Sequence, residues 1–224
     1  MFARFDRMAK AFTRVGKDIA IAVKQGGPIP ENNPKLRMAI QNAKGLNMPK
    51  EKVENAIKRA SSKEEKDFQE VVYEGYAPHG VPILVECATD NPTRTVANVR
   101  LHFSKGGGSM GNSGSVAFLF ERKGIFKFEP GKINIDEIEL DLIDAGAEDI
   151  ERGDEEVVIY TKFTEFGHMA KFLESKHLDA KSSELHYIPN MTKELSEAET
   201  DEVLKLVEML EGDDDVQTVY HNLA

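Results

Sequence analysis

The chain has 224 residues, of which 40% are hydrophobic and 30% charged, a balance typical of a globular protein with room for one large domain or two to three small ones. Its apolar runs are too short to span a membrane, and the N-terminal sequence MFARFDRMAKAF lacks the apolar core of a secretory signal. A single cysteine, Cys87, excludes a disulfide framework and favours a reducing, cytoplasmic location.

The net charge of −10 conceals a strong asymmetry along the chain. Residues 1–60 contain 13 Lys/Arg and 5 Asp/Glu, a net charge of +8, so the remaining residues carry −18. A basic segment joined to an acidic body favours contact with a polyanion through the basic part alone. The sequence therefore predicts an oriented nucleic-acid contact at the N-terminus.

Three helices are expected in this basic segment. Apolar residues recur at helical spacing from Phe5 to Val23, Asn33-Pro34 is a helix start, and Pro49 opens a third helix. The pair at 34–60 resembles a helix-turn-helix only in outline. The basic side chains expected to contact nucleic acid are Arg7, Lys10, Arg14, Lys17, Lys24, Lys35, Arg37, Lys44, Lys50, Lys52, Lys58 and Arg59.

Helices and strands alternate in the rest of the chain, which indicates an α+β protein. The patterns predict a strand at 80–90, a helix at 92–105, strands at 115–122 and 125–129, and a helix at 135–146. They further predict strands at 147–154 and 156–161, a helix at 164–176, a strand at 182–189, a helix at 196–210 and a strand at 215–222. Ser196 and Glu199 have capping-box spacing.

Three domains account for this order. Residues 1–67 form a basic helical domain with a linker at 61–67. Residues 124–190 have the β-α-β-β-α-β order of a ferredoxin-like domain. Because the helix and strand after residue 191 lack local partners, we expect them to complete a middle α+β domain with residues 68–123, the ferredoxin-like domain being inserted between the two parts.

The loop KGGGSMGNSGS, from Lys105 to Ser115, contains the spacing G-x-G-x-x-G. It follows a helix and precedes a strand, the reverse of a dinucleotide-binding loop, and no Lys-Ser/Thr follows it. Two interpretations remain: helix termination with a simple connection, or a flexible loop that contacts a partner's backbone. The residues assigned to a flexible contact loop are Gly106, Gly107, Gly108, Ser109 and Gly111.

Arg94, Asn98 and Lys105 fall within one arc of the helix before that loop and are further candidates for phosphate contact. The alternative is an ordinary solvated helix face. The six histidines show no metal-ligand spacing, Cys87 is expected in the core, and no nucleophile motif is present. We therefore expect no cofactor, no metal, no small-molecule substrate and no enzymatic activity.

Several long stretches resemble one family. The sequences NNPKLRMAIQNAKGLNMPKEKVENAIKRA, YEGYAPHGVPILVECATDNPTRTVANVR, GGSMGNSGSVAFLFERKG and DDDVQTVYHN closely resemble the YebC/PmpR family and its relatives, the mitochondrial translational activators of cytochrome oxidase subunit I. The resemblance implies a three-domain, non-enzymatic protein of gene expression. Members usually begin with a longer basic leader, and its shortness here predicts fewer phosphate contacts and weaker binding.

Two functions stand open at this point. The resemblance implies a DNA-binding transcriptional regulator. A basic N-terminal segment, an acidic remainder and a glycine-rich loop equally suit a translation factor that contacts rRNA in the ribosome. A protein-interaction scaffold leaves the +8 segment unexplained. No heptad repeat or other dimer seam is visible, which favours a monomer.

Overall fold

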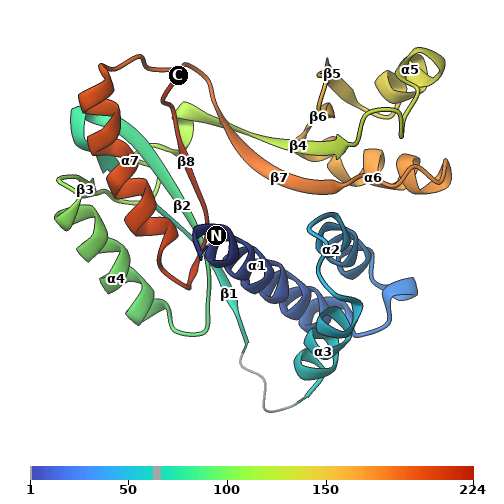
Figure 1. Cartoon of the computed structure of the whole chain (residues 1–224), viewed down its shortest axis with the longest axis horizontal. Helices are drawn as coiled ribbons and strands as arrows, with labels where there is room; N and C mark the ends of the chain where they lie inside the picture. Colours follow the sequence, from blue (N-terminus) through green and yellow to red (C-terminus); the bar gives the residue numbers. More distant parts are fainter. Residues whose placement is uncertain (1, 63–66) are drawn as a thin grey trace. The chain divides into compact units, whose positions relative to one another are not determined.

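The computed structural model describes residues 2–62 and 67–224, with side chains described from Met8 onward (Figure 1). Residues 1–63 and 122–187 cluster into one compact unit, and residues 64–121 and 188–224 into a second. Helices and two antiparallel sheets confirm the α+β class. The division into three domains stays a prediction. None of the helices in the described part of the chain is both long and apolar enough to cross a membrane.

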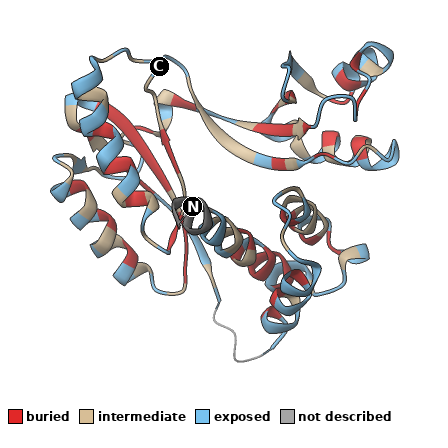
Figure 2. Cartoon of the chain, viewed as in Figure 1, coloured by how far each residue is buried: buried red, intermediate tan, exposed pale blue. Residues whose placement is uncertain are grey.

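The first unit begins with the three expected helices, which run over α1 (Phe2–Gly26), α2 (Pro34–Gly45) and α3 (Lys50–Ala60). Asn33 is the N-cap of α2: its side-chain oxygen accepts from Leu36 N at 3.1 Å, and its amide donates to Ala22 O at 2.7 Å. One side chain therefore starts α2 and ties it to α1. Buried residues lie where α1 contacts the other two helices (Figure 2).

The same unit contains a four-stranded sheet with the strand order β5-β6-β4-β7. Its elements are β4 (Phe120–Phe128), α5 (Ile135–Asp144), β5 (Ala147–Arg152), β6 (Val157–Lys162), α6 (Phe166–Ser175) and β7 (Ser182–Pro189). The chain therefore follows the predicted strand-helix-strand-strand-helix-strand order. Phe126, Phe128, Leu142, Ile159 and Met169 are buried in its core.

The second unit is built on a sheet with the order β3-β1-β2-β8. Its strands are β1 (Gln69–Ala77), β2 (Val81–Thr89), β3 (Ser109–Met110) and β8 (Val216–His221), and its helices are α4 (Pro92–Lys105) and α7 (Glu197–Glu211). The pairing of β8 with β2 joins segments that are more than 120 residues apart in the sequence. The long strand β1 was not anticipated.

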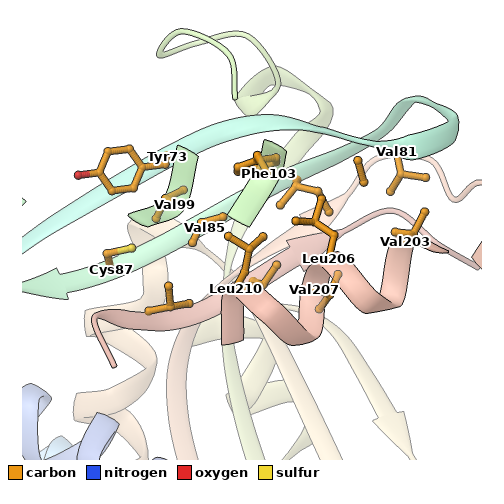
Figure 3. Packing of buried hydrophobic residues seen from close by; sticks show 14 residues of the cluster. Tyr73, Val81, Val85, Cys87, Val99, Phe103, Val203, Leu206, Val207 and Leu210 are labelled. Atoms are coloured by element: carbon orange, nitrogen blue, oxygen red, sulfur yellow. The ribbon is translucent and has the colours of Figure 1, made fainter. Parts of the chain in front are cut away.

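The helices α4 and α7 pack together on one face of this sheet (Figure 1). Figure 3 shows Phe103 of α4 and Leu206 and Leu210 of α7 directed towards Val81 and Val85 of β2. The capping box of α7 is present, because Ser196 and Glu199 bond each other's main-chain N–H groups. Local capping and long-range packing thus select the same helix boundary.

One strand prediction was wrong. The segment 115–122 was expected to be a strand separate from 125–129, but a single strand β4 begins at Phe120, and Ala117–Leu119 form one turn of 3-10 helix. The apolar run beginning at Val116 resembles a strand in sequence. The carboxylate of Glu74 holds the main chain before Phe120 in a turn, a tertiary interaction that overrides the local pattern.

Candidate nucleic-acid interface

Most basic residues of α1–α3 lie outside the helical core. Val15 and Ile19 of α1, Leu36 of α2 and Val53 of α3 are buried, so the polar faces point outward. Eight of the predicted basic side chains are exposed, and we call them the helical basic surface: Lys10, Lys24, Lys35, Lys44, Lys50, Lys52, Lys58 and Arg59.

Most of this surface retains its positive charge. Lys50 forms an exposed pair with Glu54 at 3.6 Å, and Lys35 donates to the uncharged Gln25 side chain at 2.8 Å. Lys52 lies 5.2 Å from the centre of the Phe12 ring, a cation–π contact that keeps its charge. Exposed single pairs are worth little in water, so these contacts leave the side chains available to a polyanion.

Three other predicted residues of these helices are placed differently, and Arg7 lies outside the described side chains. Lys17 is buried with 9% of its surface exposed, although it was expected on the outer arc of α1. The reason is that α1 contacts both α2 and α3, which covers a wider arc than one apolar stripe. Arg14 is half-buried. Arg37 pairs with Glu174 at 2.8 Å and donates to Pro30 O, so it has a structural role.

Arg94 is held by carboxylates of its own unit. Its guanidinium lies 2.7 Å from Asp215 and 2.8 Å from Asp90. Hydrogen bonds to Asp215 and then Asp90 raise the pKa of this guanidinium further above its ordinary value. Asp215 is 5% exposed and also accepts from Thr95 Oγ1 at 2.8 Å. Arg94 therefore anchors the α4 N-terminus to the turn before β8.

The other members of that arc differ from one another. Asn98 donates to Asp213 at 3.1 Å, and His102 lies 3.4 Å from the same carboxylate. Lys105 is exposed. The acidic run Asp213 to Asp215 follows α7 as expected of a turn, but it also supplies the partners of Arg94 and Asn98. Long-range acid–base pairing of this kind leaves no periodic signal in a sequence.

The glycines after α4 have structural roles. Gly108 N–H donates to Phe103 O at 2.8 Å and Gly107 N–H to Ser104 O at 3.4 Å, the two bonds of a Schellman motif. Gly107 adopts the positive φ of 73° that this motif requires. A Cβ atom on Gly106 would lie 2.8 Å from Leu206, and one on Gly108 would lie 2.5 Å from Tyr76 O. Helix termination and close packing thus account for these three glycines.

The remainder of the loop is also attached to the sheet. Ser109 and Met110 form β3 and pair with β1, and Gly111 N–H donates to Glu74 O at 2.8 Å. Beyond them, the Glu74 carboxylate accepts from the main-chain N–H groups of Gly114, Val116 and Ala117 at 2.6, 2.7 and 2.8 Å. Contact of Gly106, Gly107, Gly108, Ser109 and Gly111 with a partner stays a prediction.

Glu74 is the residue that sequence reasoning missed. Burial raises the pKa of its carboxyl, but the hydrogen bonds from the main chain, that of Val116 first, outweigh burial and hold the pKa below its ordinary value of 4.5. Glu74 lies on the face of β1 opposite to that of the core residues Tyr73 and Ala77, and a charged residue within an apolar strand is the trace of this role in the sequence. Among residues 2–62 and 67–224, no three His, Cys, Asp or Glu side chains come together as ligands for a metal ion.

Comparison with known proteins identifies the family. A family model described as the N-terminal domain of TACO1/YebC proteins matches residues 1–63, and one described as their second and third domain matches residues 68–223. The chain is 56% identical to a "Probable transcriptional regulatory protein" of Anaeromyxobacter dehalogenans, over 100% of this chain and 95% of that protein. A protein of the same name from Cytophaga hutchinsonii is 54% identical, over 99% and 93%.

A solved structure gives the same result. The crystal structure of a conserved hypothetical protein from Aquifex aeolicus matches with a TM-score of 0.82 and 40% sequence identity, covering 96% of this chain and 90% of that chain. The family models and the relatives extend over almost every residue, through both sheets and the basic helices. The chain therefore belongs to the TACO1/YebC family.

Proposed function

We propose that this protein regulates gene expression by binding nucleic acid through the helical basic surface. The observation that carries the proposal is that eight exposed basic side chains gather on α1–α3, whereas the rest of the chain carries a net charge of −18. Such a distribution attracts a polyanion to one region and repels it from the others. The names of the relatives support duplex DNA as the first partner to test.

The contacts of this surface are mainly with phosphates. Its members are lysines apart from Arg59, and lysine acts as a point charge rather than a bidentate reader of base edges. Binding by such groups releases counterions, so affinity falls steeply with salt, with a slope of about −0.9 per phosphate contact on B-DNA. Salt dependence is therefore the property that tests the proposal most directly.

The test replaces Lys50, Lys52, Lys58 and Arg59 of α3 by glutamine and measures affinity for a 30-base-pair duplex between 50 and 200 mM salt. If all four side chains contact phosphates, the slope becomes smaller by about 3.6. A control variant removes four exposed basic charges elsewhere, at Arg100, Lys132, Lys162 and Lys205. Equal slopes in wild type and the α3 variant would refute the assignment.

A second arm distinguishes the two gene-expression functions. Purified protein is mixed at physiological salt with ribosomes and an excess of promoter-sized duplex DNA, and the mixture is sedimented. A DNA-binding regulator stays with the DNA. Recovery with ribosomes, lost in the α3 variant, would transfer the same phosphate-contact mechanism to rRNA and replace transcription by translation in the proposal.

A further inference from the structure

The helix α2 is tied to the edge strand β7 within the same compact unit. The side-chain amide of Asn42 donates to Ser183 O at 3.0 Å, and its oxygen accepts from Ser183 N–H at 2.8 Å. One asparagine thus pairs with both main-chain groups of Ser183, as a neighbouring strand would. An edge strand presents unpaired groups of this kind, so Asn42 covers part of the edge.

Two further contacts maintain this arrangement. The pair between Arg37 and Glu174 connects α2 to α6. At the C-terminal end of α2, Gly45 lies against Lys181: a Cβ atom on Gly45 would overlap Lys181 O and lie 3.3 Å from Lys181 Cγ. Only glycine allows this approach, which brings Lys181 beside the residue that follows Lys44 in the chain.

Lys181 therefore lies beside the residue that follows Lys44, although 136 residues separate Lys44 and Lys181 in the sequence. Both side chains are exposed, and neither forms an ion pair with any carboxylate of the described residues. Lys44 belongs to the helical basic surface. We propose that Lys181 extends this surface onto the β7 side, so that Lys44 and Lys181 contact the same phosphodiester backbone. This inference rests on the function proposed above.

The competing role for these lysines is structural, because α2 ends at Gly45 and cations near a helix C-terminus offset its partial negative charge. The two roles differ in what they change. A helix-end role lowers the free energy of unfolding when the charge is removed and leaves nucleic-acid affinity unaltered. A phosphate contact lowers affinity and its salt slope and leaves stability close to that of wild type.

The experiment compares Lys181→Ala with Lys205→Ala, using one 30-base-pair duplex as DNA and as RNA. Lys205 is exposed on α7 between Asp201 and Glu208, so its charge is compensated locally and it serves as the matched control. For Lys181→Ala we expect the slope to fall by about one contact, so that the loss of affinity from 50 to 200 mM salt is about 3.5-fold smaller than in wild type. Lys205→Ala should match wild type.

Asn42→Ala tests whether the two hydrogen bonds between Asn42 and Ser183 position Lys181. Without the Asn42 side chain, Ser183 loses these bonds and Lys181 is no longer held close to α2. Lys181→Ala should therefore change the salt slope of affinity less in the Asn42→Ala background than in the wild-type background. Faster hydrogen exchange at the Ser183 amide verifies that its hydrogen bond to Asn42 is lost. An unchanged salt slope in Lys181→Ala, together with weakened binding in the α3 variant, would refute this inference and leave the proposed function standing. If the wild-type protein bound neither duplex, both would be refuted.

Discussion

Glu74 offers the sharpest test of how the second unit is held together. The residue is 5% exposed, and its carboxylate accepts three main-chain hydrogen bonds from Gly114, Val116 and Ala117. Replacement by glutamine keeps the shape but removes the charge and turns one acceptor into a donor. The perturbation therefore acts on the turn that precedes β4 and on little else.

The magnitude follows from these three bonds. Hydrogen bonds to a charged group contribute about 1.5–3 kcal/mol each, and neutral ones about 0.5–1.5. Two bonds in Glu74→Gln become neutral, each losing about 1 kcal/mol, and the third donor, Gly114 N–H, faces an amide nitrogen at a further cost of about 1 kcal/mol. We expect a destabilisation of about 3 kcal/mol in total.

The assay is urea unfolding, with amide hydrogen exchange at Val116 and Ala117 to locate the effect. Glu70→Gln, an exposed position on the same strand, is the control and should change stability by less than about 0.5 kcal/mol. Because the pKa of Glu74 is lowered on folding, its contribution is complete above the ordinary pKa of 4.5 and is lost as pH falls through the folded value. A wild-type advantage below 1 kcal/mol, or one that persists undiminished at strongly acidic pH, would refute the reasoning.

Three other outcomes are expected. Gly45→Ala should destabilise by about 1–3 kcal/mol in urea because its Cβ meets Lys181 O, whereas Gly16→Ala, with nothing within 4 Å, should be neutral or stabilising. Ser196→Ala removes the capping box of α7 and should cost about 1 kcal/mol by the same measurement. Arg94→Gln should leave DNA affinity within about twofold of wild type, and a lower salt slope would contradict its structural role.

Much of the fold was predictable because local chemistry and tertiary packing agree. Asn33-Pro34 starts α2, Asn91 and Pro92 start α4, and Ser196 starts α7, each through a cap whose spacing is visible in the sequence. Caps of this kind satisfy main-chain donors within one turn and need no distant partner. These boundaries were therefore correct to within a residue or two.

The misplaced features depend on partners far along the chain. Glu74 lies 42 residues from Val116, and Asp215 lies 121 residues from Arg94, so neither interaction leaves a periodic trace. Lys17 was assigned to the surface because helical periodicity describes one helix, not the two that pack against it. In each case the sequence shows which residues are charged, but only the fold shows which charges are used internally.

Charged side chains in the second unit and on α1–α3 differ in how far they are used in contacts within the protein. In the second unit, Asp215 and Asp90 hold Arg94, and the Glu74 carboxylate holds main-chain donors, so charged groups there stabilise the fold. Residues 1–60, in contrast, contain 13 basic residues and only five acidic ones. Eight of these basic side chains are exposed on α1–α3, where like charges repel one another and an anion would relieve the repulsion. If the proposed function holds, duplex DNA should raise the unfolding temperature of these helices, and the increase should become smaller as salt increases.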